Sequence, residues 1–453
     1  MTECIPERFD FASLGGARET VAEFSGGTIT SDAGGLLLQE ADLKMNLLSR
    51  FSECFLDGRN PLLIEHSVEQ MIRQRVYALT LGYEDLNDHD QLRQDPLLGL
   101  MAGKADPGTE LLAGKSTLNR MELGTGTPTR YKKITFWRDG VDELLVNVFL
   151  EAHPVAPPQI VLDIDTTDLA LHGNQEGRFY HGYYGHYCYL PLYIFCGDHV
   201  LCARLRPSNI GPGVGSRKEV ERVVQQIRQR WPEVQIILRG DSGFCGDELM
   251  AWCEQNRVEF VIGMARNKRL ESLVAGPLAE AKQLFESTQQ AARVFVEFQH
   301  ETLNGSWSQQ RRVVAKAEHI DGKSNPRFIV TSLDSGRWDK QILYEELYCA
   351  RGDMENRIKE QFVLFADRVS ASTMRANQLR IYLSVMGYTL LNGLRRLGLR
   401  TTALATAQVG TIRLRILKIG ALVRVTVRKV WVRMASSYPY QALFSQVLQQ
   451  LRQ

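Results

Sequence analysis

Three aspartates of this 453-residue chain stand in apolar stretches, where a folded protein rarely leaves a charge without a partner. Asp163 and Asp165 lie two residues apart in the β-branched run 159–167, so both side chains point to one face of the predicted strand. Asp241 follows the apolar run 234–238, at the carboxyl end of a second predicted strand, where ligands of open α/β sheets commonly bind. A carboxylate in such a place must be solvated at a cleft, paired with a cation or bound to a metal. The alternative for Asp241 is a turn residue before Ser242.

Glu355 is expected on a helix that begins near Gln341. Tyr348, Arg351 and Glu355 occupy positions i, i+3 and i+7, and about 100° of rotation per residue places all three on one helix face. A solvated helix face would explain the same spacing. If the helix meets the two strands, however, its carboxylate adds a third acidic group to those of the sheet.

Three carboxylates from two strands and a helix are able to hold two Mg²⁺ ions about 4 Å apart. Mg²⁺ prefers hard oxygen ligands, and Mn²⁺ is able to take its place at such sites. One ion activates a water or a 3′-hydroxyl, and the other stabilises the leaving oxygen of an in-line phosphoryl displacement. A nucleotide cofactor is not expected, because the run from Gly108 to Ser116 has five residues between its glycines where a phosphate-binding loop has four.

The elements that must position these residues begin after a proline-rich linker, 153–158. Apolar and β-branched runs predict strands at 159–167, 190–195, 200–205, 234–238 and 259–262, with helices at 216–231 and 247–256. Hairpin strands followed by strand–helix–strand alternation indicate an α/β domain with a mixed sheet.

The region 267–334 interrupts this alternation. Residues 293–300 and 310–318 alternate like a polar-faced antiparallel pair, and 327–332 would add a third strand. This pattern predicts a β-rich insertion, after which a helical pattern resumes over 340–397.

Residues 1–155 are expected to be mostly helical, because apolar residues recur at helical spacing over 36–48 and 68–79. A third short helix would start at Ser116 or Thr117, both reasonable N-caps. Lys115 and Arg120 place basic side chains at this helix, which would suit it to a DNA groove. A plain helical bundle explains the same pattern equally well.

The net charge of +2 conceals an uneven distribution along the chain. Residues 368–453 contain 14 Lys and Arg and no Asp or Glu, so residues 1–367 hold 40 basic and 52 acidic residues, a balance of −12. Such asymmetry suggests a polyanionic partner such as nucleic acid. The alternative is a tail that docks on the acidic surface of the protein itself.

The cysteines, the apolar runs and the first residues of the chain indicate which kind of protein to expect. The eight cysteines form no Cys-x-x-Cys pair, which favours reduced thiols over a zinc ribbon or a redox motif. No apolar run reaches the roughly 18 residues that a bilayer span needs, and the first residues lack the plan of a signal peptide. We therefore expect a globular cytoplasmic protein.

The acidic motifs resemble those of a known family. They are Asp165-Thr-Thr, Gly240-Asp-Ser-Gly-Phe244 and Tyr348-x2-Arg351-x3-Glu355, and further matching stretches are 118–122, 171–184 and 365–370. The chain is similar to bacterial insertion-sequence DDE transposases, and more narrowly to the insertion-sequence family numbered thirteen-eighty, from about residue 20 to about residue 400.

The resemblance implies a ribonuclease-H-like mixed-sheet core with a β-rich insertion before the catalytic Glu. The implied layout is a helical DNA-end-binding region at 1–155, the first part of the core at 156–266, the insertion at 267–334, the second part of the core with the catalytic helix at 335–397, and a basic C-terminal region at 398–453.

Carried over by motif, the resemblance makes Asp165, Asp241 and Glu355 the metal-binding catalytic triad, with Asp163 as the alternative to Asp165. Tyr348 and Arg351 would contact phosphates at the transposon end.

Two further roles are implied less directly. Related elements carry a Lys seven residues after the Glu; here that position is Phe362, and Lys359 is the nearest basic candidate. Trp307, in the insertion, would stack on a flipped base, as an aromatic does in relatives with hairpin intermediates; packing in the insertion's own core is the alternative.

The expected function is that of a transposase. It would bind the terminal inverted repeats of its element, cut the phosphodiester bonds of double-stranded DNA with two Mg²⁺ ions and join the freed 3′-hydroxyls to target DNA, as a homodimer on the bacterial nucleoid. Two alternatives stay open: a ribonuclease-H-like nuclease that cuts without joining, and a DNA-binding protein without catalysis.

Overall fold

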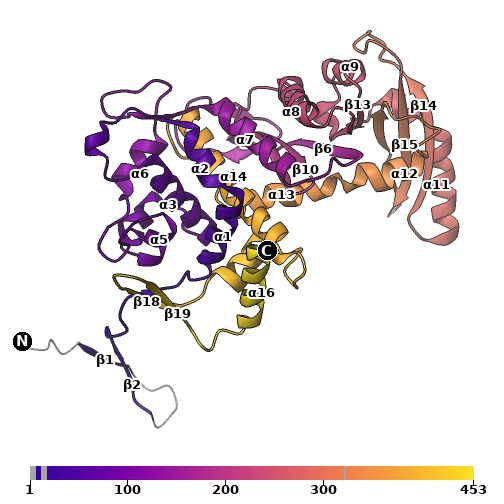
Figure 1. Ribbon diagram of the computed structural model, residues 1–453. Coiled ribbons are helices and arrows are strands. Elements are labelled where there is room, and N and C mark those ends of the chain that lie inside the picture. Colours follow the sequence, from indigo (N-terminus) through magenta and orange to yellow (C-terminus); the bar gives the residue numbers. More distant parts are fainter. Residues whose placement is uncertain (1–6, 12–17, 321) are drawn as a thin grey trace, which may run out of the picture. The chain divides into compact units, whose positions relative to one another are not determined.

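The computed structural model describes residues 7–11, 18–320 and 322–453, which belong to two compact units (Figure 1). The central unit consists of Glu53–Leu56 and Glu122–Val385. The terminal unit consists of Met1–Ser52, Asp57–Met121 and Met386–Gln453. The expected boundary near residue 155 thus falls earlier, after Met121. The expected C-terminal region 398–453 is part of the same unit as the N-terminal helices rather than a region by itself.

The central unit is built on a nine-stranded mixed sheet, which confirms the α/β prediction. The strands in spatial order are β11 (His199–Arg204), β10 (Leu192–Cys196), β6 (Gln159–Thr166), β12 (Gln235–Gly240), β13 (Val258–Met264), β17 (Arg327–Thr331), β15 (Arg311–Ile320) and β14 (Ala292–His300), with β16 (Lys323–Ser324) beside β15. Strands β6, β12 and β13 are parallel, and the strands outside them pair antiparallel. The parallel strands place their carboxyl ends at one edge of the sheet.

Helices cover the sheet as the periodicity of the sequence predicts. Helix α8 (Ser216–Arg230) buries four apolar residues at helical spacing, and α9 (Asp247–Gln255) and α7 (Arg138–Glu151) bury apolar faces of their own. Side chains of these helices and of the strands form one large core cluster. Burial of these apolar faces, more than helix propensity, fixes the helices in place.

The region expected to be a β-rich insertion differs from that expectation in two respects. Strand β17 pairs with β13, so β14, β15 and β17 extend the main sheet instead of forming a sheet of their own. The region also contains two helices, α10 (Lys268–Leu273) and α11 (Ala275–Thr288), the second of which packs on β14 and β15. Strand partners distant in the sequence determine this arrangement, and local periodicity does not reveal them.

The helical pattern expected over 340–397 is broken into several elements. They are α12 (Lys340–Ile342), the π-helical turn η4 (Leu343–Tyr348), the 3₁₀ turn η5 (Cys349–Arg351), α13 (Gly352–Val363) and α14 (Met374–Leu394). A small antiparallel sheet of β7 (Leu169–Ala170), β9 (His186–Tyr189) and β8 (Phe179–His181) follows β6, and β5 (Ile134–Phe136) pairs with β4 (Phe55–Asp57).

The terminal unit is mostly helical, as expected. Its principal helices are α1 (Gly35–Met45), α2 (Leu47–Glu53), α3 (Val68–Leu81), α4 (His89–Leu92), α5 (Pro96–Met101), α6 (Lys115–Glu122), α15 (Val409–Ile412) and α16 (Gln441–Arg452). Ser67 and Gln70 form a capping box that starts α3. Helix α6 starts at Lys115, one or two residues before the predicted N-caps. A sheet of β19 (Val430–Met434), β18 (Ala421–Val425) and β3 (Ile29–Thr30) and a hairpin of β1 (Arg8–Phe11) and β2 (Thr20–Glu23) complete the unit.

Two expectations concern the chain as a whole. All cysteines within the described ranges are free thiols; Cys4 lies outside those ranges. None of the helices in the described part of the chain combines the length and the apolar character that crossing a membrane requires.

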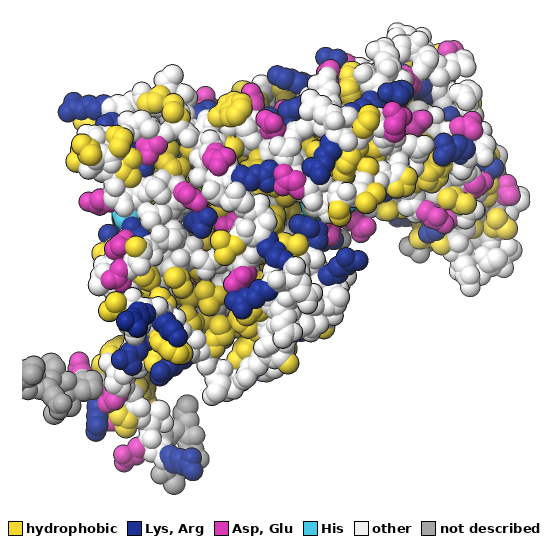
Figure 2. Space-filling view, viewed as in Figure 1, with side chains coloured by type: hydrophobic (Ala, Val, Ile, Leu, Met, Phe, Trp, Pro, Cys, Tyr) yellow, Lys and Arg dark blue, Asp and Glu magenta, His cyan; other side chains and the backbone are white. Residues whose placement is uncertain are grey.

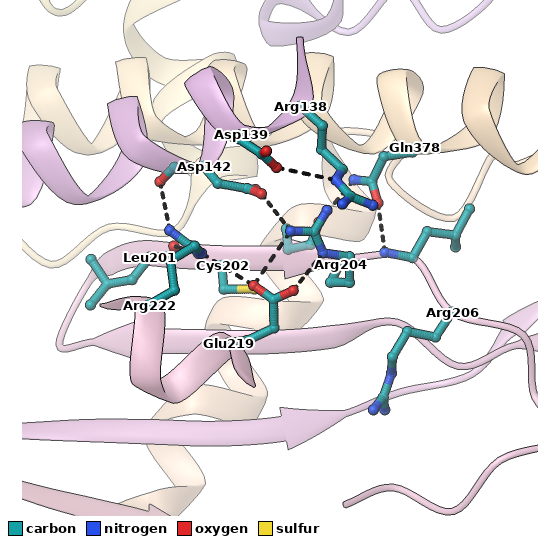
Figure 3. Close-up of polar contacts among 12 residues, drawn as sticks. Arg138, Asp139, Asp142, Leu201, Cys202, Arg204, Arg206, Glu219, Arg222 and Gln378 are labelled. Carbon is teal, nitrogen blue, oxygen red and sulfur yellow. Dashed lines mark hydrogen bonds and ion pairs between the residues drawn. The ribbon is translucent and has the colours of Figure 1, made fainter. Parts of the chain in front are cut away.

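A buried ion-pair network fastens two helices to the edge strand β11 (Figure 3). Arg204 of β11 donates hydrogen bonds to Asp142 of α7 at 2.5 Å and to Glu219 of α8 at 2.9 Å. Arg222 donates to the second oxygen of Glu219, and Tyr382 of α14 donates to Asp142. Asp142 is 0% exposed and Arg204 is 9% exposed, so each charge depends on its partner rather than on water.

We expect Arg204→Met to lower the free energy of unfolding by about 3–5 kcal/mol, because Asp142 and Glu219 would stay buried without their cation. The control Arg217→Met removes an arginine of α8 whose pair with Glu248 is exposed, and it should cost less than about 1 kcal/mol. Urea denaturation followed by tryptophan fluorescence measures both. Equal losses would contradict a structural role for the network.

Candidate active site

Asp163 is held by an arginine on the neighbouring strand. Arg239 of β12 lies opposite Asp163 of β6 in the parallel register and donates two hydrogen bonds to its carboxylate, at 2.5 and 2.8 Å. Both side chains are buried, with exposed fractions of 5% for Asp163 and 7% for Arg239. Asp163 therefore serves as the counter-ion of a buried guanidinium, the paired state that a carboxylate in an apolar strand requires.

Asp165 lies two residues further along β6 and faces a different cation. It is 8% exposed, accepts a hydrogen bond from the amide of Thr166 and accepts another from Arg351 at 3.1 Å. Burial, together with the negative charges of Asp241 and Glu355, raises the pKa of Asp165 to about 6, although the Arg351 charge works in the opposite direction. A carboxyl group with such a pKa is poised between its neutral and charged forms near physiological pH.

Asp241 follows the last residue of β12, at the same height along the sheet as Asp165 of β6. Gly240, the last residue of β12, pairs with Ile164 of β6, so the next residues of the two parallel strands are Asp241 and Asp165. Asp241 Oδ1 accepts a hydrogen bond from the amide of Gly243 at 2.9 Å, which is the turn that the local sequence allowed. A carboxylate has a second oxygen, so this turn is compatible with a role in ligand binding.

The segment 340–363 carries the helical residues of the site and packs on one face of the sheet. Leu343, Tyr344 and Leu347 are buried in a core cluster with side chains of β12, β13, β15 and β17. Arg239, the partner of Asp163, also donates a hydrogen bond to the carbonyl of Leu347 at 2.5 Å. The Asp163–Arg239 pair thus fastens the π-helical turn η4 to the sheet. Such turns inside helices occur frequently at functional sites.

Arg351 bridges the sheet and the helix. One of its terminal nitrogens donates to Asp165 and the other donates to Glu355, both at 3.1 Å. Burial disfavours the charge of Arg351, but the negative charges of Asp165, Glu355 and Asp241 raise its pKa overall. Glu355, on the first turn of α13, keeps a side chain that is 49% exposed. Arg351 is therefore the cation around which the carboxylates of strand and helix gather.

Tyr348 lies beside Asp241 because β13 offers it space. A Cβ atom on Gly263 would lie 2.5 Å from the Tyr348 hydroxyl oxygen and 2.9 Å from the amide nitrogen of Ser242. Only a glycine at position 263 allows this close approach. Burial raises the pKa of Tyr348, and the charge of Asp241 raises it further. The importance of Gly263 could not be seen in the sequence.

The donor set fits a divalent cation in type. Asp165, Asp241 and Glu355 offer carboxylate oxygens only, which suits Mg²⁺ or Mn²⁺, and burial is the main cause of the raised pKa of Asp165, to which the charges of Asp241 and Glu355 add. Within residues 7–11, 18–320 and 322–453, however, no three His, Cys, Asp or Glu side chains lie close enough together to hold a metal ion. Arg351 stands between Asp165 and Glu355 in this arrangement.

Sequence comparison identifies the family. A family model described as "Transposase DDE domain group 1" matches residues 12–453. The chain belongs to the DDE transposases. Enzymes of this family cleave DNA, transfer its strands and generally depend on divalent metal ions. A solved structure described as "Cryo-EM structure of piggyBac transposase synaptic complex with hairpin DNA" is similar with a TM-score of 0.40 and 11% identity, covering 86% of this chain and 80% of that chain. No curated protein matches.

The other predicted DNA contacts lie on α13 and in the terminal unit. Lys359 is exposed on α13, one helical turn after Glu355. In the terminal unit, Lys115 forms an ion pair with Asp90 at 3.0 Å, and Arg120 is exposed on the same helix, α6.

Trp307 lies in the hydrophobic core rather than at a surface. It is 9% exposed, packs its ring against His300 at 5.6 Å and lies under the guanidinium of Arg311. This placement is the packing alternative, so stacking of Trp307 on a flipped base would require the core to open.

The glycine-rich loop 211–215 supports the site. Arg206, 7% exposed, donates hydrogen bonds to the carbonyls of Pro212 and Val214 at 3.0 and 2.7 Å (Figure 3 shows Arg206). A Cβ on Gly213 would lie 3.0 Å from the carbonyl oxygen of Gly243. The loop thus packs against the turn that follows Asp241. The glycine-rich sequence of the loop is the feature from which this close packing could have been predicted.

The two aspartates of β6 should respond differently to neutralisation. Burial raises the pKa of Asp165 to about 6 in the fold, against about 3.9 in an unfolded chain, so the cost of burying its charge builds up between about pH 4 and pH 6 and is complete above that range. We expect Asp165→Asn to stabilise the protein by about 1–3 kcal/mol at pH 8 and by much less at pH 4, where little of this cost has built up.

The matched variant is Asp163→Asn, which leaves Arg239 buried without its counter-ion. It should destabilise the protein by about 3 kcal/mol at pH 8. Urea denaturation at both pH values measures the two variants side by side. Equal behaviour of the two variants would contradict the division of roles between these carboxylates.

Proposed function

We propose that this transposase acts on the terminal inverted repeats of an insertion sequence of the family numbered thirteen-eighty, cutting DNA and joining the 3′-hydroxyl ends to target DNA. The observation that carries the proposal is that Arg351 donates to both Asp165 and Glu355, with Asp241 near enough for its charge to raise the pKa of Asp165, in a chain that belongs to the DDE transposases. Asp163 is left out of the triad, because the Arg239 guanidinium already engages both of its oxygens.

Asp165, Asp241 and Glu355 would hold two Mg²⁺ ions, or Mn²⁺ in their place. When bound, such ions activate the attacking oxygen and stabilise the leaving oxygen of a phosphodiester. Binding of the metal ions would require two changes among the residues of the site. Asp165 must be ionised to serve, and its pKa of about 6 satisfies this above neutral pH. Arg351 must withdraw from at least one of its two carboxylates, and a DNA phosphate is the natural new partner for its guanidinium.

Tyr348 and Lys359 are proposed to contact the same DNA strand. Tyr348 lies beside Asp241, where its hydroxyl is able to donate a hydrogen bond to a phosphate oxygen, and Lys359 is exposed one helical turn after Glu355. Lys115 and Arg120 on α6 would contribute to recognition of the transposon end. Cutting of two ends within one event implies a homodimer on DNA, and the expected place of action is the bacterial nucleoid.

Cleavage of end-containing DNA tests the triad. Asp165→Asn, Asp241→Asn and Glu355→Gln should each lower the rate of Mg²⁺-dependent cutting more than about 100-fold, since replacing residues that merely support a metal ligand costs about 10–100-fold. The control Glu346→Gln removes an exposed acid of the same helical segment and should cut at the wild-type rate. Chelation of divalent ions should abolish cutting, measured on gels with labelled duplex. Wild-type rates in the triad variants would refute the assignment.

Strand joining separates the transposase from its two rivals. With paired transposon ends and a supercoiled target plasmid, we expect covalent products that carry the labelled 3′ ends in the plasmid. A nuclease without joining would give cut ends and no such products. A DNA-binding protein without catalysis would give neither, while still retarding the labelled ends in gels.

A further inference from the structure

Two groups of cations in the acid-free tail differ in their partners. One group is committed to the terminal unit itself: Lys418 pairs with Asp32 at 2.6 Å, Arg452 pairs with Glu40 at 3.3 Å, and Arg413 donates to the carbonyl of Thr80 at 2.8 Å. The docking alternative therefore accounts for part of the tail. It does not account for the second group, which lies on the hairpin of β18 and β19.

This hairpin is a two-stranded antiparallel ribbon with one exposed face. Arg424 of β18 lies opposite Trp431 of β19, and Leu422 lies opposite Arg433. Because side chains alternate along a strand, these four share one face, and all four are exposed, Trp431 by 49%. The intervening residue Val423 is only 5% exposed. The inner face thus anchors the ribbon, and the outer face presents cations and an indole.

The tip of the ribbon continues the same surface. The turn is closed by hydrogen bonds between Thr426 and Lys429, including one from the amide of Thr426 to the carbonyl of Lys429 at 2.9 Å. Arg428 and Lys429 are exposed, and the Lys429 ammonium lies 5.6 Å from the centre of the Trp431 ring. Val427, which precedes Arg428 in the turn, is fully exposed, which burial in the fold does not explain.

The ribbon also lines a groove of about 1000 Å³ in the terminal unit. Residues 423–430 line it together with Thr28 and the loop 105–109. Asp106 is the acidic residue among the lining side chains, and its Oδ1 accepts a hydrogen bond from the amide of Gly108. Figure 2 shows Lys and Arg side chains gathered over β18 and β19. Within the described ranges, Arg424, Arg428, Lys429 and Arg433 form no ion pair with an acidic side chain.

Four unpaired cations, an exposed indole and an exposed apolar tip on a narrow ribbon match the chemistry of a DNA duplex. A two-stranded ribbon fits a DNA groove, and Lys and Arg neutralise the flanking phosphates. Apolar side chains at such tips contact sugars and bases in the groove. An acidic protein would suit the charges but would give no role to an exposed valine at the tip, next to Arg428. We propose that the β18–β19 ribbon is a DNA-contacting arm that holds a duplex mainly through its phosphates, separately from the carboxylate site.

The choice of DNA as the polyanion rests on the proposed function, whereas the ribbon's own contribution is tested without catalysis. The full-length protein carrying Arg424→Gln, Arg428→Gln, Lys429→Gln and Arg433→Gln is compared with wild type on a 25-base-pair duplex that lacks end sequences. Fluorescence anisotropy at increasing KCl, without divalent ions, gives the dissociation constant and its salt dependence.

We expect the ribbon variant to bind at least tenfold more weakly at 0.1 M KCl. The slope of log Kd against log[KCl] should fall by about 3–4, since each phosphate contact contributes about 0.9. Trp431→Ala should weaken binding with an unchanged slope, because an indole releases no counter-ions. Wild-type affinity and slope in the ribbon variant would overturn the proposal.

The matched control removes four exposed lysines of the central unit, as Lys218→Gln, Lys268→Gln, Lys282→Gln and Lys323→Gln, and should retain most of the affinity. An equal loss in this control would overturn the proposal, as would displacement of DNA by polyglutamate at equal charge concentration. If Glu355→Gln cuts DNA like wild type, the catalytic assignment fails while the ribbon stands, because the binding measurement involves no cutting.

Discussion

Repulsion between carboxylates at the carboxyl ends of β6 and β12 is the constraint on which the rest of the site depends. Asp163, Asp165 and Asp241 come from adjacent strands, and Glu355 approaches from a helix. A fold is able to keep such charges together only if cations lie among them. Arg239 donates to both oxygens of Asp163, whereas Arg351 is shared by Asp165 and Glu355. Burial raises the pKa of both aspartates, and the nearby charges of Asp241 and Glu355 add to the rise at Asp165, whose pKa reaches about 6.

The placement of Arg351 depends in turn on how its helix is fastened. Apolar side chains of η4 pack on the sheet, and the Leu347 carbonyl receives a hydrogen bond from Arg239. The same arginine therefore neutralises one aspartate and positions the segment that serves the other. Gly263 adds a second constraint, because only its missing side chain leaves space for Tyr348 beside Asp241. The site therefore has two carboxylates two residues apart on one strand. Asp163 has Arg239 to itself, whereas Asp165 shares Arg351 with Glu355.

Much of this arrangement is predictable from the sequence, and the limits have physical causes. Strong periodicity and β-branched runs predict β6, β12 and α8 almost to their observed bounds, and strand ends predict that Asp165 and Asp241 meet. The partner of Asp163 could not be predicted, because it depends on the register between strands 76 residues apart. The π-helical turn and the burial of Trp307 are likewise consequences of tertiary packing.

The pairing of β17 with β13 has a mechanical consequence. The chain leaves β12 with Asp241, passes through the whole region 267–334 and returns with Glu355, yet every strand on the way is hydrogen-bonded into one continuous sheet. The region is therefore a rigid connection. Strand ladders, and not a flexible linker, set the spacing between Asp241 and Glu355. Length changes in the exposed turn 303–306, ahead of the buried Trp307, would leave that spacing intact, whereas a single-residue deletion within β15 would shift the ladder and carry the shift to the helix that bears Glu355.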